Sequence, residues 1–159
     1  MAFADFKSAQ SSPSDGIAAA LRELASGRKT GHWIWYVFPQ IKGLGYSSMS
    51  QSYALQDLAE AVAYLRDPTL RARLVQITAI VAERLEKGDQ LTKLMGGRID
   101  ALKVVSSLTL FELAARKLDT GPDSKDGTEF AALCGRVLSA AETQGFPRCQ
   151  FTIASIRNG

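Results

Sequence analysis

The apolar residues of this chain recur at intervals of three and four along most of its length, and this spacing constrains the fold more than any other feature. In residues 68–87 one stripe is formed by Leu70, Leu74, Ile77, Val81 and Leu85. Residues at such intervals lie on one face of an α-helix. Similar stripes occur in residues 14–26, 57–67, 98–118 and 128–144. Because short connections join these segments, the sequence predicts an all-α fold, a single-domain multihelical bundle.

Capping signals set the expected helix boundaries. Asp57 and Glu60 have the spacing of a capping box, in which the two side chains satisfy backbone N–H groups at the start of a helix. Asp67 and Pro68 suit an N-cap followed by the first helical residue. Thr128 is expected to cap the last long helix, after a polar loop that contains a Gly-Pro pair.

The two ends of the chain show less regular patterns. Residues 1–13 are mostly small and polar, so we expect a flexible N-terminus there. Residues 14–159 then form the single all-helical domain. Within it, residues 149–156 are too few to be assigned to a helix or a strand from their pattern.

Composition excludes several classes of function. The chain has 159 residues, of which 46% are hydrophobic and 22% charged, and this suits one folded domain. Its net charge of +3 is spread among acidic residues, so nucleic-acid binding is not expected. No apolar run approaches the roughly 20 residues that cross a membrane, and no signal peptide precedes the domain, so we expect a cytoplasmic protein.

The sequence also contains no pattern that indicates a metal site or a reactive cysteine. One histidine and two distant cysteines, Cys134 and Cys149, do not make up a metal site, and we expect neither a metal nor a cofactor. The cysteines are expected to be reduced and inert, because neither has a neighbouring base to activate it.

The segment His32–Gly45 (HWIWYVFPQIKGLG) is the first candidate for a functional site. It holds both tryptophans and the only histidine of the chain, and it ends in a Gly-Leu-Gly loop followed by serines. Its apolar run fits a buried strand or a buried helix equally well. The aromatic rings can form core or line a pocket that stacks on a planar ligand. The glycines can serve a turn or an anion-binding loop.

A second candidate lies in the segment 98–118, where polar residues interrupt a leucine-rich helix. Asp100, Lys103 and Ser107 fall on nearly one helical face. Lys103 can pair with Asp100 at the surface, or it can hold a ligand phosphate or meet Glu60 across the bundle. Hydroxyl groups buried in mid-helix need partners, so they either bond the preceding turn or face a polar cavity.

These motifs resemble a small bacterial family that is classed as a domain of unknown function and has some members labelled "calpastatin". The first shared motif is His32–Gly45. The second lies in Ser48–Leu65 and contains Tyr53, Glu60, Ala61, Tyr64 and Leu65. The third contains Asp100, Lys103, Ser106, Ser107, Thr109, Leu110 and Phe111. The resemblance covers about residues 15–115 and implies an all-helical single domain without an established activity. A calpastatin-type inhibitor is a long disordered chain, which this core-forming composition does not match.

The chain also has a weaker resemblance to a helical family named for NAD and ADP-ribose, whose members are N-glycosidases. Both have a glutamate on an early helix, and then a lysine with small hydroxyl residues on a later helix. The counterparts here would be Glu60, Asp100 and Lys103. This resemblance implies hydrolysis of a glycosidic bond, with a carboxylate that stabilises an oxocarbenium-like transition state.

The sequence leads to one preferred hypothesis, a protein that binds a nucleotide or a small molecule derived from NAD or ADP-ribose. Its catalytic candidates, if it is an enzyme, are Glu60, Asp100 and His32. Its candidate ligand-binding residues are Trp33, Trp35, Gln40, Gly43, Gly45, Ser48, Tyr53, Lys103 and Ser107. The sequence makes no prediction of the oligomeric state.

Two alternatives stay open at this point. In a non-catalytic protein-interaction module, Trp33 and Trp35 would be sealed in the core and Lys103 would point to open water. In a ligand-binding protein, the same residues would be partly accessible and would converge. Contact with RNA through the aromatic residues and basic turns would instead give an affinity that falls steeply with salt.

Overall fold

The structure of the protein, a computed structural model, describes residues 3–118 and 121–158. In this part of the chain every regular element is a helix, apart from one isolated β-bridge. The helices are α1 (Ala4–Gln10), α2 (Ile17–Ala25), α3 (Ile34–Val37), α4 (Ser48–Ser52), α5 (Leu58–Arg66), α6 (Pro68–Glu86), α7 (Leu91–Leu94), α8 (Arg98–Arg116), α9 (Ser124–Thr143) and α10 (Gln150–Asn158). The predicted all-α, single-domain fold is confirmed.

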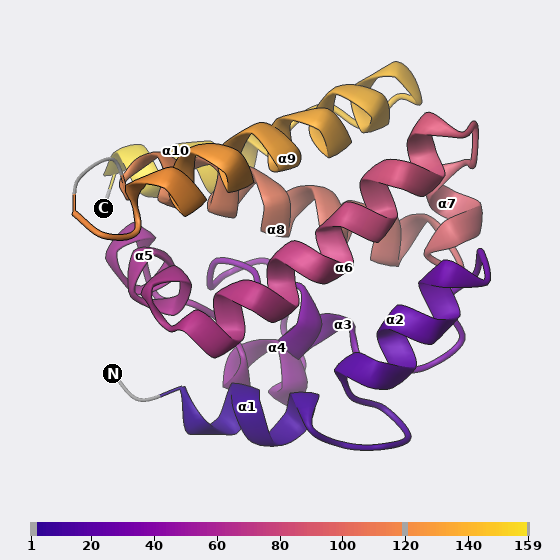
Figure 1. Ribbon diagram of the computed structural model, residues 1–159, viewed down its shortest axis with the longest axis horizontal. Helices are drawn as coiled ribbons and strands as arrows, with labels where there is room; N and C mark the ends of the chain where they lie inside the picture. The colour runs from indigo at the N-terminus through magenta and orange to yellow at the C-terminus, as the bar shows by residue number, and fades with distance from the viewer. Residues whose placement is uncertain (1–2, 119–120, 159) are drawn as a thin grey trace.

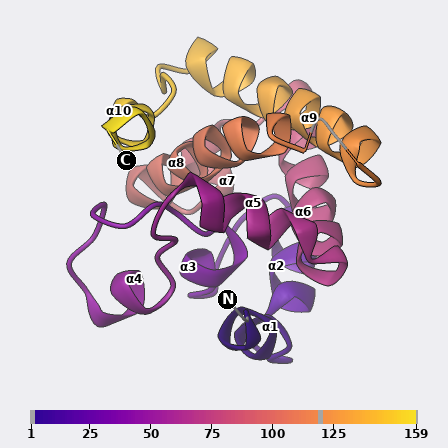
Figure 2. The ribbon, with the colours of Figure 1, turned by 90° about the vertical axis from the view of Figure 1, so that its left-hand side faces the viewer.

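Helix α8 lies at the centre of the bundle. Helices α3, α5, α7, α9 and α10 all contact it, and α9 also packs along α6 (Figures 1 and 2). Most of its side chains from Ala101 to Ala115 are buried. A helix that is apolar on all sides needs neighbours on all sides, so the sequence of α8 requires the layered arrangement around it.

Local capping signals work as the sequence predicts at two helices. The Asp67 carboxylate accepts hydrogen bonds from the backbone N–H groups of Thr69 and Leu70 at the start of α6. Asp57 accepts from the backbone N–H of Glu60 at 2.8 Å. The Glu60 carboxylate reaches back to the backbone N–H of Gln56, one residue earlier than in a standard capping box.

Two boundaries in the C-terminal part of the chain differ from the prediction. Helix α9 begins at Ser124, so Thr128 lies inside the helix and donates its hydroxyl to the Ser124 carbonyl instead of capping. Residues Gln150–Asn158, which the pattern left unassigned, form α10. Tertiary contacts with α8 support this short helix, and such contacts cannot be seen in a local pattern.

The N-terminal segment also differs from the expected flexible tail. Residues 4–10 form α1, and Phe3 and Phe6 are buried. Phe6 makes edge-on ring contacts with Tyr53 and Tyr64. The buried Gln10 amide donates to the Tyr64 hydroxyl at 3.0 Å. The two phenylalanines therefore anchor a segment whose other side chains are mostly small and polar.

The aromatic stretch becomes a single helical turn, α3, flanked by irregular chain. Trp33 and Phe38 are fully buried and their rings lie against each other. Tyr36 is also buried and donates its hydroxyl to the Asp15 carbonyl. Trp35 is only partly buried. This stretch thus supplies the core on one side and reaches the surface at Trp35.

Residues 42–54, including α4, project from the helical body as one loop (Figure 2). Its two ends are held together by the parallel bridge between Ile41 and Leu55. The Leu55 carbonyl accepts from Lys42 N–H at 2.8 Å, and the Leu55 N–H donates to the Gln40 carbonyl at 2.9 Å. A compact loop with closed ends is an Ω-loop, so we call residues 42–54 the Ω-loop.

Within the described residues, no helix is both long enough and apolar enough to cross a lipid bilayer.

Replacement of Asp67 tests how much the cap of α6 contributes. We expect Asp67→Ala to lower the free energy of unfolding by about 1–2 kcal/mol, because it removes both capping bonds and the ion pair with Lys7. Asp67→Asn keeps an acceptor oxygen and should lose clearly less. Urea denaturation followed by circular dichroism measures both, and equal losses in the two variants would contradict the capping role.

The same contribution should depend on pH. Burial alone would raise the pKa of Asp67, but bonds from Lys7 and from the Leu70 N–H outweigh it and hold the pKa below its usual value. A carboxylate with a lowered pKa stabilises the folded state above its unfolded pKa and loses this effect as the pH falls. The stability difference between wild type and Asp67→Asn should therefore shrink below about pH 4.

Candidate functional site

Two lysines and one aspartate meet between the α2–α3 connection and the start of α8. The Asp100 carboxylate lies 2.8 Å from Lys29 Nζ and 3.2 Å from Lys103 Nζ. Lys29 is only 8% exposed, and its ammonium group also donates to the Gly31 carbonyl. Burial alone would raise the pKa of Asp100, but the bonds from the two lysines outweigh it and lower the pKa. Asp100 is therefore ionised at neutral pH.

Each lysine also lies against a tryptophan ring. Lys103 Nζ is 3.8 Å from the ring centroid of Trp35, and Lys29 Nζ is 5.1 Å from that of Trp33. Both distances lie within the range of cation–π attraction. We call these five residues, Lys29, Trp33, Trp35, Asp100 and Lys103, the lysine–tryptophan cluster. It joins the aromatic stretch to the polar face of α8.

Glu23 of α2 fixes the backbone that carries this cluster. Its Oε1 accepts from the backbone N–H groups of Thr30 and Gly31, each at 2.7 Å, and from Trp33 Nε1 at 3.0 Å. Burial alone would raise the pKa of Glu23, but these bonds outweigh it and lower the pKa. One carboxylate thus sets both the turn before α3 and the orientation of the Trp33 ring.

A small cavity lies next to Trp35, beneath the Ω-loop. It encloses about 10 Å³, which is close to the minimum space for one water molecule. Gln40 is 7% exposed, and its Nε2 has no hydrogen-bond partner among the described residues. The cavity is lined by Trp35, Gln40, Ile41, Gly43, Leu44, Gly45, Ser50, Tyr53 and Ala54. An unpaired buried amide donor costs about 1–3 kcal/mol, so this site needs a polar partner.

Two glycines let the Ω-loop close over this cavity. Gly45 approaches Ser50 so closely that a Cβ atom there would lie 2.7 Å from the Ser50 side chain. Gly43 has a φ of +99° and lies under Phe151 of α10, whose ring would be 2.9 Å from an added Cβ. A side chain at either position would force the loop away from its closed arrangement.

The structure brings many of the predicted site residues together. Trp35, Gln40, Gly43, Gly45 and Tyr53 line the cavity. Lys103 lies on the ring of Trp35 and pairs with Asp100, but neither of these two residues lines the cavity.

Five other predicted residues lie elsewhere. Trp33 is fully buried, and Ser107 is a core residue whose hydroxyl has no partner among the described residues. His32 and Ser48 are exposed. Glu60 makes only local bonds at the start of α5, and in the described part of the chain no ion pair joins it to Lys103.

No local pattern in the sequence marks Lys29 or Glu23 as a residue of the site. Lys29 follows the end of α2, where a cation normally complements the helix dipole, and Glu23 lies in α2 among ordinary surface positions. Both find their partners only when the turn between α2 and α3 folds back. Only the tertiary structure makes them visible.

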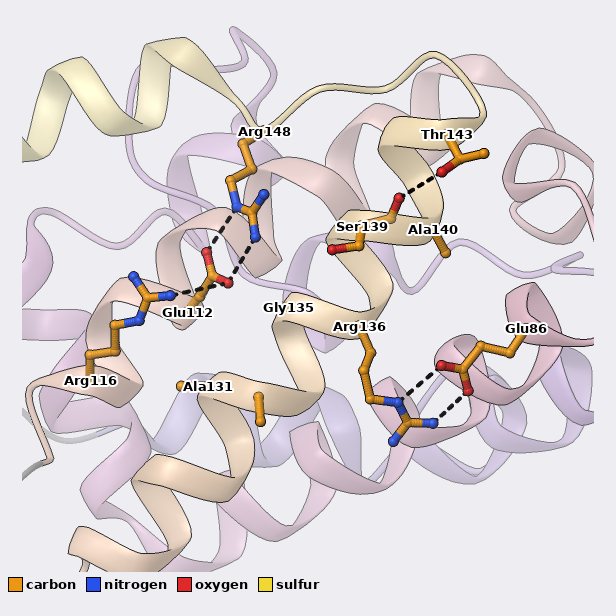
Figure 3. Close-up of a pocket in the computed structure, with 11 residues that line it drawn as sticks. Glu86, Glu112, Arg116, Ala131, Gly135, Arg136, Ser139, Ala140, Thr143 and Arg148 are labelled. Carbon is orange, nitrogen blue, oxygen red and sulfur yellow. Dashed lines mark hydrogen bonds and ion pairs between the residues drawn. The ribbon is translucent and has the colours of Figure 1, made fainter.

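A hollow on the opposite side of the bundle is more open and is lined by charged residues (Figure 3). Both oxygens of Glu112 accept from Arg148, each at 3.0 Å, and Arg116 lies 3.6 Å from the same carboxylate. Across α9, Arg136 makes a two-pronged bond to Glu86. The floor between them consists of small residues of α9, and a Cβ at Gly135 would lie only 3.2 Å from Glu112.

Neither region offers a metal site. Among the described residues, no group of three or more His, Cys, Asp or Glu side chains converges as metal ligands would. Cys134 is buried in the core, and burial raises the pKa of its thiol, as does the charge of Glu112.

Comparison with known proteins places the chain among uncharacterised relatives. The family model described as "Protein of unknown function (DUF1810)" matches residues 1–121. The crystal structure of the conserved hypothetical protein Rv1873 from Mycobacterium tuberculosis is similar, with a TM-score of 0.76 and 32% sequence identity over 97% of this chain and 95% of that one. No curated protein matches the sequence. The resemblance to a family of unknown function is confirmed.

Substitution of Glu23 tests its role in setting the turn. Glu23→Ala leaves three N–H donors without their acceptor, and we expect it to lower the free energy of unfolding by about 2–3 kcal/mol. Glu23→Gln keeps one acceptor oxygen and should cost less. Because the pKa of Glu23 is lowered, the advantage of wild type over Glu23→Gln should fade as the pH drops below about 4.5. A difference that persists at pH 3 would contradict this account.

Proposed function

The chain belongs to this family of proteins of unknown function, and we propose that it binds a nucleotide-like ligand, with a planar ring and an anionic group, between Trp35 and the Ω-loop. The family model covers the whole lysine–tryptophan cluster and the Ω-loop, and it ends before α9. The observation that carries the proposal is the buried Nε2 of Gln40, which has no partner among the described residues, in a residue that lines a cavity together with Trp35 and Tyr53.

The residues around this cavity supply the interactions that a nucleotide needs. Trp35 and Tyr53 offer flat faces for stacking on a base. Gln40 offers an amide donor for a ring carbonyl or a ring nitrogen. Lys103 covers one face of Trp35, so a base would stack on the other face, and the Lys103 side chain would turn past the edge of the ring toward the phosphate of that ligand.

Lys103 is free to bind a ligand because the Asp100 carboxylate can stay paired with Lys29 alone. Lys29 is buried and holds Asp100 at 2.8 Å, whereas Lys103 makes a longer contact of 3.2 Å. When Lys103 turns toward a ligand phosphate, Asp100 keeps the ion pair with Lys29. The cost of leaving an unpaired buried charge is thereby avoided.

The cavity must enlarge to admit such a ligand, and the Ω-loop provides the means. Its ends are fixed by the Ile41–Leu55 bridge, while its tip carries Tyr46, which is 94% exposed, and Met49. A loop fixed at its base can lift at its tip without unfolding the body. We therefore propose that the tip of the Ω-loop lifts when a ligand enters.

Hydrolysis of a glycosidic bond is a second proposal, and it would depend on Asp100. This carboxylate is ionised and lies beside Lys103 and Trp35, where a bound sugar would be. An anionic carboxylate can stabilise an oxocarbenium-like transition state. The two lysines partly neutralise Asp100, and Glu60 stays at the start of α5, so we propose binding as the primary function.

The interaction-module alternative receives mixed support from the geometry. Trp33 is sealed, as that alternative requires, but Trp35 is partly accessible and Lys103 lies on its ring rather than in open water. A ligand pocket is favoured because Trp35 contacts Lys103 and lines the same cavity as Gln40. The proposal also keeps the expected cytoplasmic location, where the free thiols Cys134 and Cys149 would stay reduced.

Thermal unfolding with AMP, NAD and ADP-ribose at millimolar concentration tests the binding proposal. At 100 times its dissociation constant, a ligand stabilises the folded state by about 2.7 kcal/mol, which raises the melting temperature by several degrees. We expect such a shift from one of these compounds, and its loss in Trp35→Ala, Gln40→Leu and Lys103→Ala. Lys93→Ala, at an exposed lysine of α7, serves as the matched control. No shift from any compound, or one that survives all three substitutions, would refute the proposal.

The hydrolysis proposal has its own test. The compound that binds is incubated with the protein, and the released base is quantified by chromatography. We expect Asp100→Asn to abolish the release and Glu60→Gln to retain it, because only Asp100 lies in the cluster. Binding without any release would leave the binding proposal intact and exclude the hydrolase.

A further inference from the structure

A second concave site lies between α8 and α10, next to the hollow of Figure 3. The two share Glu112, Arg116 and Arg148. The second site, which we call the arginine hollow, has a volume of about 370 Å³. Its lining consists of Thr109, Glu112, Leu113, Arg116, Arg148, Ile153, Ile156 and Arg157.

The arginine hollow carries more positive than negative charge. The residues that line it include three arginines, Arg116, Arg148 and Arg157, and one carboxylate residue, Glu112. Glu112 is only 4% exposed, and it holds the guanidinium of Arg148 with two bonds of 3.0 Å. The buried Glu112 carboxylate therefore fixes the orientation of the Arg148 guanidinium, and the two charges neutralise each other.

The remaining two arginines are not needed for this pair. Arg116 lies 3.6 Å from the Glu112 oxygen, which Arg148 already engages, and its side chain is largely exposed. Arg157 has no ion pair among the described residues. Within a concave surface, an excess of like charge raises the local concentration of ions of the opposite sign.

Arg116 and Arg157 are not needed to hold α10 against α8. The link from Arg148 to Glu112 and the bond from Cys149 N–H to Thr109 Oγ1 at 3.1 Å already fasten the start of α10 to α8. Arg116 and Arg157 therefore add charge to the hollow rather than contacts between the helices.

The other wall of the hollow is apolar. Leu113, Ile153 and Ile156 are each partly buried and lie beside the arginines. Guanidinium groups bind phosphate oxygens through paired hydrogen bonds, and aliphatic side chains favour an alkyl or other apolar body. A ligand that matches both walls has a charged phosphate head and a short apolar tail.

We propose that the arginine hollow binds a small amphiphilic phosphate monoester, with the phosphate against Arg116 and Arg157 and the apolar body against Leu113, Ile153 and Ile156. This site uses none of the residues of the lysine–tryptophan cluster. It is therefore independent of the function proposed for that cluster.

Titration of the whole protein with n-hexyl phosphate, inorganic phosphate and hexanol, followed by NMR or calorimetry, tests the proposal. We expect hexyl phosphate to bind at least tenfold more tightly than inorganic phosphate, because each fully buried methylene tightens binding roughly fourfold. Hexanol should not bind measurably. A parallel arm uses phosphatidylcholine vesicles with and without phosphatidic acid, which distinguishes a lipid headgroup from a free ester.

Variants locate the site. The double variant Arg116→Gln, Arg157→Gln should weaken binding of hexyl phosphate at least tenfold, and Arg28→Gln, at an exposed arginine beyond α2, should leave it unchanged. Ile156→Ser should weaken the hexyl ester but not inorganic phosphate, and melting curves confirm that each variant folds. Binding that survives the double variant, or equal affinity for hexyl phosphate and inorganic phosphate, would overturn the proposal. Absence of binding in both the soluble and the vesicle arm would overturn it as well.

Discussion

Burial of α8 on all sides is the constraint on which the rest of the structure depends. A helix surrounded by protein needs partners for the polar groups that it carries, because unpaired groups are costly away from water. Among the described residues, Ser107 is the one buried side chain of α8 whose polar atom lacks such a partner. Ser106 and Thr109 donate their hydroxyl groups to carbonyls of the preceding turn. Glu112 requires Arg148, and this brings the start of α10 against α8.

The same constraint produces the lysine–tryptophan cluster. Asp100 and Lys103 lie in the first two turns of α8, where the helix leaves the core. Asp100 is neutralised by Lys29 from the turn after α2, and Lys103 is covered by Trp35 from the aromatic stretch. Polar residues of the central helix thus act as attachment points for segments that are distant in the sequence. The two attachments meet where Asp100 contacts Lys103, and Trp35 connects them to the candidate site.

Sequence reasoning could predict what depends on neighbouring residues. The helical stripes, the Asp67 cap and the all-α class follow from short-range patterns. It also singled out Trp35, Gln40 and Lys103, because aromatic rings, glycines and an isolated lysine are conspicuous in composition. It could not distinguish Trp33 from Trp35, since neighbouring positions in one apolar run go to opposite environments only once the fold is known. No local pattern marks the residues whose roles depend on contacts between distant segments, namely Lys29, Glu23 and Arg148.

The bridge between Ile41 and Leu55 has a consequence for how this protein can evolve. Because the base of the Ω-loop is fixed independently of its tip, the inserted residues form an exchangeable module. Mutations near Tyr46 and Met49 alter side chains that contribute little to the core, so selection can change them at small cost to folding. Homologous proteins can therefore share one helical body and diverge in what they recognise through this single segment.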